Sequence, residues 1–178
     1  MERQARPVTL AWSNPVVRWW GFLSFVSAAN IAIWFALYRQ FHEQSNGSFS
    51  NTSGIGLMML LCAAYVFGCA FRSVLPRADV QRICLFDHWL SSVMVGRTVA
   101  TVAEVCFAAQ WAIILHQLGT MTGAETTVNI AWTIVPLIVI AECFSWYAVL
   151  TTHYLCNAIE NSIWAVVFFL VGIALCRL

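Results

Sequence analysis

Residues 128–154 read VNIAWTIVPLIVIAECFSWYAVLTTHY, an apolar run of 27 residues that contains a single charged side chain, Glu142. About 20 apolar residues are enough for an α-helix to cross the hydrocarbon core of a bilayer. The run therefore predicts a membrane-spanning helix. A carboxylate within such a helix is costly and is most often functional, so Glu142 marks the first candidate for a site.

Four further apolar runs cover residues 17–38, 54–71, 89–116 and 161–177. The chain of 178 residues is 61% hydrophobic and 10% charged, and its mean hydropathy is +0.76. These values exceed what the polar surface of a soluble domain allows. We expect an all-α polytopic bundle of about five spans in one membrane domain, 17–178, after a tail, 1–16. The short last run suggests that the natural chain continues beyond Leu178.

The arginines indicate how the spans are oriented. They gather before the first run and between the second and third, at Arg3, Arg6, Arg18, Arg72, Arg77 and Arg82. The loop at 39–53 contains only Arg39, and no basic residue follows the third run before the fourth. The positive-inside rule therefore places the N-terminus in the cytoplasm. The segment at 72–88 is amphipathic, as expected at the headgroup boundary.

The external loop at 39–53 is polar and contains the tripeptides Asn46-Gly-Ser and Asn51-Thr-Ser. Both fit the acceptor pattern for N-glycosylation, and the predicted orientation exposes them on the required side if the source is eukaryotic. Such tripeptides also arise by chance in loops rich in serine and asparagine, which is the simpler explanation.

Several chemistries are excluded by what the chain lacks. It contains no lysine, so a Schiff-base lysine and a P-loop lysine are both impossible. It has neither an HExxH nor a GxSxG motif. Its seven cysteines form no CxxC pair, and we read them as small buried apolar residues. The pattern identifies no cofactor and predicts no nucleic-acid partner.

Polar residues recur at helical spacing in the third run. Arg97, Thr101 and Glu104 are four and three residues apart, which places them on one face of a helix. Arg97 and Glu104 are separated by about 10 Å along the axis, at ~1.5 Å per residue. We therefore expect each of these two charges to find its partner on another helix.

A second polar set follows in and after the fourth run. It comprises Glu142, Trp146, His153, Asn157 and Glu160, at offsets of 4, 11, 15 and 18 residues. These offsets fit a 3.6-residue period, so we expect one stripe along one helix.

Glu104 and Glu142 lie near the middle of consecutive spans, which run in opposite directions. We expect them at similar depth, facing the protein interior because charged side chains avoid lipid. There the two carboxylates can share a proton, or Arg97 can pair with Glu142. The alternative is a structural clamp, in which these polar groups only hold the helices together.

The histidines offer a weaker second site. We expect His88 and His153 near the cytoplasmic surface, with Asp87 and Glu160 close to them in sequence, as in a metal or proton-entry cluster. Local hydrogen bonding is the commoner role of histidines near helix ends. His116 is expected near the opposite face.

Transport of protons, ions or small solutes is the function that this pattern favours most. A membrane enzyme acting on a lipid-derived substrate and a non-catalytic subunit or sensor remain alternatives. The lipid bilayer is the expected environment, and self-association or a partner membrane subunit is a further expectation. The compartment is either a bacterial inner membrane or a eukaryotic endomembrane or plasma membrane.

Overall fold

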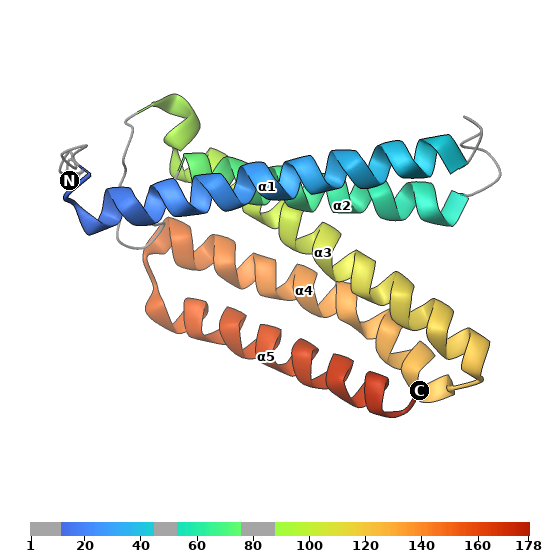
Figure 1. The fold of residues 1–178 in the computed structure, drawn as a ribbon. Helices are drawn as coiled ribbons and strands as arrows, with labels where there is room; N and C mark the ends of the chain where they lie inside the picture. Colours follow the sequence, from blue (N-terminus) through green and yellow to red (C-terminus); the bar gives the residue numbers. More distant parts are fainter. Residues whose placement is uncertain (1–11, 45–52, 76–87) are drawn as a thin grey trace. The chain divides into compact units, whose positions relative to one another are not determined.

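The computed structural model describes residues 12–44, 53–75 and 88–178, which form five long helices and one short 3-10 helix (Figure 1). The helices are α1 (Pro15–Gln44), α2 (Ser53–Val74), η2 (Trp89–Ser91), α3 (Val93–Thr122), α4 (Glu125–Thr151) and α5 (Tyr154–Cys176). All five α-helices are long and apolar enough to cross a membrane, and the described ranges contain no strand. The predicted all-α membrane protein with five spans is confirmed, whereas its orientation stays a prediction.

Polar caps fix the first residues of α1 and α3. Asn14 Oδ1 accepts a hydrogen bond from the Val16 amide at 3.0 Å, and Pro15 occupies the first helical position of α1. Proline suits this position because its missing N–H would have no partner there. Ser92 Oγ likewise accepts from the Val95 amide at 3.3 Å. Since this cap lies after η2, α3 begins at 93 rather than at 89.

The chain divides into two compact units, Met1–Ala103 and Glu104–Leu178, and each is described by itself. In the first unit, α1 packs along α2 through tryptophans. Trp34 Nε1 donates to the Met59 carbonyl at 3.3 Å, and Trp20 Nε1 donates to the Val74 carbonyl at 3.0 Å. The Trp34 ring meets Phe67 edge to face at 5.5 Å. The two indole N–H groups are thereby satisfied within the membrane-spanning region.

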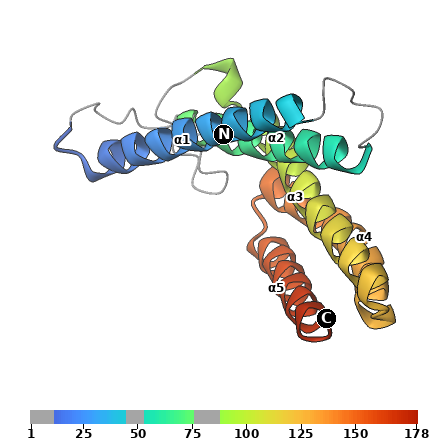
Figure 2. The ribbon, with the colours of Figure 1, turned by 45° about the vertical axis from the view of Figure 1, so that its right-hand side comes forward.

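The second unit contains α4, α5 and the part of α3 that follows Ala103. Figures 1 and 2 both show α4 running beside α5, and this pair packs closely. Apolar side chains from all three helices fill the core of the unit: Ala108, Leu115, Ile130, Ala131, Ile134, Ile138, Val167, Val171 and Ala174. Alanines in this core allow the helix backbones to approach one another, as is usual between membrane helices.

Two tight turns connect these helices. After α3, Gly123 takes a positive φ of 71°, and the next amide, of Ala124, donates to the Gly119 carbonyl at 2.9 Å. This is a common helix termination, in which glycine avoids the steric cost of the left-handed region. After α4, Thr152 adopts φ 57°, and its amide N–H donates to the Ala148 carbonyl.

The turn at Thr152 corrects two expectations. Residues 142–160 do not form one helix, because α4 ends at Thr151 and α5 begins at Tyr154. The last span is also not short: α5 has 23 residues and begins seven residues before the expected start at 161. The break was missed because threonine seldom adopts the left-handed region and no glycine or proline marks the turn.

The six cysteines in the described ranges form no disulfide and are not buried as expected. Cys62, Cys106 and Cys156 are half-buried, while Cys69, Cys143 and Cys176 are exposed. Their place on apolar helix surfaces is compatible with contact with lipid.

Some expectations fall outside the described residues. These are the glycosylation sites Asn46 and Asn51, Asp87, most of the amphipathic segment 72–88 and most of the tail 1–16.

Candidate functional site

Three glutamates from three different helices meet in the second unit. Glu104 on α3, Glu142 on α4 and Glu160 on α5 each offer a carboxylate oxygen, and these oxygens all lie within 4.8 Å of one another. Glu142 is 3% exposed, Glu160 is 9% exposed and Glu104 is half-buried. We call these three residues the carboxylate cluster. Among the described residues, no other group of three or more potential metal ligands comes together in this way.

The register between α3 and α4 brings Glu104 and Glu142 to the same level. Gly119 packs so tightly against α4 that an added Cβ would lie 2.9 Å from Val128 Cγ2 and 3.2 Å from Thr127 Cβ. Fifteen residues separate Gly119 from Glu104, and fifteen separate Thr127 from Glu142. Equal numbers of residues span equal lengths of helix, so antiparallel helices in this register place the two glutamates side by side.

A buried hydrogen bond sets the register between α4 and α5. Thr127 Oγ1 donates to the Ala174 carbonyl at 3.1 Å, and the Thr127 side chain is fully buried. Glu160 precedes Ala174 by fourteen residues, nearly the same interval as that between Thr127 and Glu142. The contacts near the α3–α4 turn therefore determine which residues converge about 22 Å away, at ~1.5 Å per residue.

The electrostatics of the carboxylate cluster favour binding of a positive charge. Two ionised carboxylates within 4.8 Å of each other repel by at least about 3.5 kcal/mol at an effective dielectric constant of ~20. Burial adds a desolvation cost for each ionised group. Three ionised glutamates at this spacing are therefore favourable only together with positive charge, which protons, a bound cation or a basic side chain can supply.

The spacing is compact enough for one ion to reach all three residues. Because the oxygens lie within 4.8 Å of one another, an ion at the centre would lie no more than about 2.8 Å from each, near the ~2.3–2.6 Å of Ca²⁺–oxygen bonds. An all-carboxylate set also suits hard cations better than zinc, which favours nitrogen and sulfur ligands.

Trp146 and Asn157 each lie within about one helical turn of a glutamate of the carboxylate cluster. Trp146 is half-buried one turn after Glu142 on α4, and Asn157 is half-buried almost one turn before Glu160 on α5. The Asn157 carbonyl accepts a hydrogen bond from Asn161 Nδ2 at 2.7 Å. Asn157 thus supplies a polar group between the start of α5 and Glu160.

Arg97 and Thr101 belong to the first unit. Arg97 is 5% exposed, and Thr101 is half-buried. Because α3 is continuous from Val93 to Thr122, both keep the predicted helical spacing from Glu104. A pair between Arg97 and Glu142 stays a prediction.

The two candidate histidines make local contacts. His88 Nδ1 accepts a hydrogen bond from the Leu90 amide at 3.3 Å and so caps η2. His153 precedes α5, and its Nδ1 lies 3.9 Å from Cys156 Sγ. Neither histidine belongs to the carboxylate cluster.

Sequence reasoning assigned Glu160 to the vicinity of these histidines, whereas the structure places it with Glu104 and Glu142. Recognition of the chain reversal at 152–153 would have predicted this position of Glu160. With that reversal, α5 runs antiparallel to α4, and Glu160 returns to the level of Glu142.

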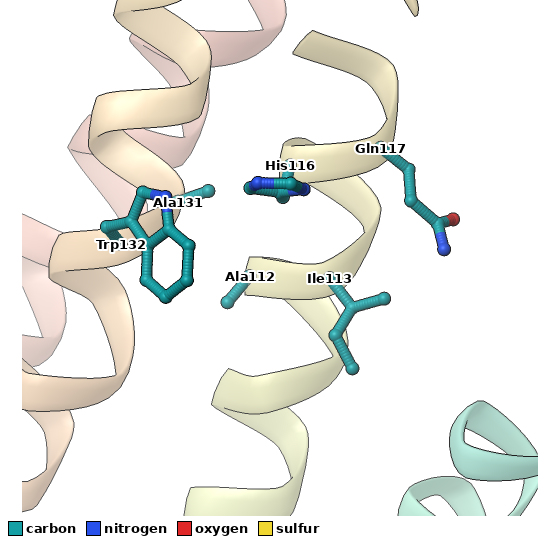
Figure 3. A pocket seen from close by; sticks show the side chains of 6 residues that line it. All are labelled: Ala112, Ile113, His116, Gln117, Ala131 and Trp132. Carbon is teal, nitrogen blue, oxygen red and sulfur yellow. The ribbon is translucent and has the colours of Figure 1, made fainter. Parts of the chain in front are cut away.

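A separate groove lies between α3 and α4 (Figure 3). It has a volume of about 280 Å³ and is lined by Ala112, Ile113, His116, Gln117, Ala131 and Trp132. The His116 and Trp132 rings meet edge to face with centroids 5.5 Å apart. The lining is mostly apolar, so the groove offers few groups for ion binding.

The chain has no detected similarity to characterised proteins that would assign these features. No family model matches it, and neither a curated protein nor a solved structure does so.

Proposed function

We propose that this protein moves protons or hard cations across a membrane and that the carboxylate cluster is its ion-binding site. The convergence of Glu104, Glu142 and Glu160 carries this proposal. Their helices are three of the five that are long and apolar enough to span a bilayer. Carboxylates within such helices are expensive, and they commonly mark ion pathways or proton relays.

Exchange of one positive charge for another follows from the electrostatics. An arriving cation relieves the repulsion between the carboxylates, so protons held by the cluster are released as the cation binds. When the cation leaves, the repulsion returns and protons bind again. This competition is the physical basis for coupling proton movement to cation movement.

The first two turns of α5 offer a polar route to the cluster. His153 is exposed at the start of α5, Asn157 is half-buried, and Glu160 is buried. Their spacing of four and three residues is that of one helical face. Exposure therefore decreases along this face towards the carboxylates, as expected for an entry path.

Flux across liposomes tests the proposal. The purified chain is reconstituted and given either a proton gradient or a gradient of Na⁺, K⁺ or Ca²⁺, with the internal pH and each cation followed by fluorescent indicators. The flux through vesicles that contain the intact protein is expected to exceed the flux through empty vesicles in at least one gradient. Glu142→Gln and Glu160→Gln are expected to reduce that flux at least about tenfold, a barrier increase of ~1.4 kcal/mol or more.

Glu125→Gln is the matched control, because Glu125 is an exposed glutamate in the first turn of α4. It is expected to leave flux unchanged. Flux no greater than that of empty vesicles in every gradient would contradict transport. Undiminished flux in the Glu142→Gln/Glu160→Gln double variant would show that the carboxylate cluster is not the site.

A further inference from the structure

The turn between α4 and α5 brings a thiol and an imidazole together outside the carboxylate cluster. Cys156 Sγ lies 3.9 Å from His153 Nδ1, within hydrogen-bonding distance for sulfur. The thiol is half-buried, and the histidine is exposed. A nucleophile beside a base is the arrangement that supports covalent catalysis or self-modification.

The backbone of the turn fixes this pair. Thr152 is held at φ 57°, and both its own amide and that of His153 donate to the Ala148 carbonyl. The Cys156 amide in turn donates to the His153 carbonyl at 3.2 Å. Residues three apart in a helical turn lie on the same face, so these hydrogen bonds keep the thiol next to the imidazole.

The start of α5 also provides hydrogen-bond donors. The first amides of a helix lack acceptors within that helix, and the His153 side chain does not cap them. The Tyr154 and Leu155 amides are therefore donors at the same helix end as the Cys156 thiol. Helix N-termini stabilise negative charge, including the oxyanion that forms when a nucleophile attacks a carbonyl carbon.

The surroundings of the pair suit an amphiphilic reactant. Tyr154 is 72% exposed and Leu155 is 63% exposed, and they are the first two residues of the α5 span. Apolar and aromatic side chains at the end of a span are expected at the boundary between lipid and water. A reactant with a hydrocarbon tail and a polar reactive head would concentrate at this position.

We propose that Cys156 is a self-acylation site that accepts a long-chain acyl group from an acyl thioester, with His153 as the general base. His153 Nδ1 takes the thiol proton while Cys156 Sγ forms a bond to the thioester carbonyl carbon. The tetrahedral intermediate then expels the original thiolate, which takes the proton back from His153. The products are an S-acyl Cys156 and a free thiol, so no external oxidant or reductant is required.

Acylation of the intact protein in nanodiscs tests this proposal with palmitoyl-CoA as the probe. Intact-mass spectrometry measures the rate, peptide mapping identifies the cysteine, and hydroxylamine release confirms a thioester. Cys176 is the matched control, because it is an exposed cysteine at the opposite end of the same helix. Cys156 is expected to acylate at least about tenfold faster than Cys176, and His153→Asn is expected to remove most of that advantage.

Two further measurements separate chemistry from folding. Asparagine is a favourable residue before a helix, so His153→Asn is expected to keep α5 intact by circular dichroism. Its reaction with N-ethylmaleimide at Cys156 is expected to slow in parallel with acylation. Equal acylation of Cys156 and Cys176, or an unchanged rate in a folded His153→Asn protein, would overturn the proposal.

Discussion

Replacing Glu142 by glutamine separates an ion site from a structural clamp. Glutamine has nearly the same shape as glutamate but carries no charge, so Glu142→Gln preserves packing and removes one negative charge from the carboxylate cluster. If repulsion among the carboxylates dominates, this loss relieves strain and the folded protein becomes more stable. If Glu142 instead anchors a cation such as Arg97, the same change leaves a buried charge less well compensated.

The structure sets the size of the effect. Each ionised pair within 4.8 Å contributes at least about 3.5 kcal/mol of repulsion at an effective dielectric constant of ~20. Partial protonation of the cluster reduces this value, since a neutral carboxyl does not repel its neighbour. We therefore expect Glu142→Gln to raise the free energy of unfolding by about 1 to 3 kcal/mol in buffer without divalent cations.

Equilibrium unfolding in mixed micelles, followed by circular dichroism during a titration with sodium dodecyl sulfate, measures this difference. Glu125→Gln serves as the control and is expected to lower stability by less than about 1 kcal/mol, through loss of a favourable charge at a helix N-terminus. A decrease of more than about 1 kcal/mol in Glu142→Gln would show the opposite, that attraction outweighs repulsion at this position.

Three substitutions and one control test the packing that positions the cluster, using the same unfolding assay. Gly119→Ala places a Cβ 2.9 Å from Val128 Cγ2, so we expect it to lower the free energy of unfolding by about 1 to 3 kcal/mol. Gly172→Ala is the control, because a Cβ there meets nothing within 4 Å and should not lower the free energy of unfolding. Thr127→Val removes the hydrogen bond to the Ala174 carbonyl and should cost about 1 kcal/mol. Thr152→Asn should raise the free energy of unfolding by about 0.5 to 1 kcal/mol, because asparagine tolerates the left-handed region better than threonine. If Gly119→Ala or Thr127→Val left the free energy of unfolding unchanged, the contact at that residue would be contradicted. If Thr152→Asn lowered the free energy of unfolding, the left-handed conformation of residue 152 would be contradicted.

The spans were predictable from the sequence because hydrophobic length alone decides whether a helix can cross a bilayer. The boundary between the last two spans was not predictable, because Thr152 adopts the left-handed conformation and no glycine marks the turn in the sequence. The interior role of Glu142 was also predictable, because the cost of exposing a carboxylate to lipid forces it inward.

The membership of the cluster required the structure. Helical periodicity gives the face of one helix but not its register against another. That register depends on the contact at Gly119 and on the hydrogen bond from Thr127 to Ala174. These features bring Glu160 to Glu104 and Glu142, although the predicted single helix had placed Glu160 eighteen residues beyond Glu142 on the same stripe.

Infrared spectroscopy of the protein in lipid tests most directly whether the carboxylate cluster is a charge-binding site. Without added cation at neutral pH, a proton-holding cluster gives a carbonyl stretching band of a protonated carboxyl group. Glu142→Gln and Glu160→Gln should each shift or remove this band, Glu125→Gln should not, and a cation that binds the cluster should diminish it. A spectrum without a protonated carboxyl band, or a band unaffected by both cluster substitutions, would show that the carboxylate cluster does not bind charge in this way.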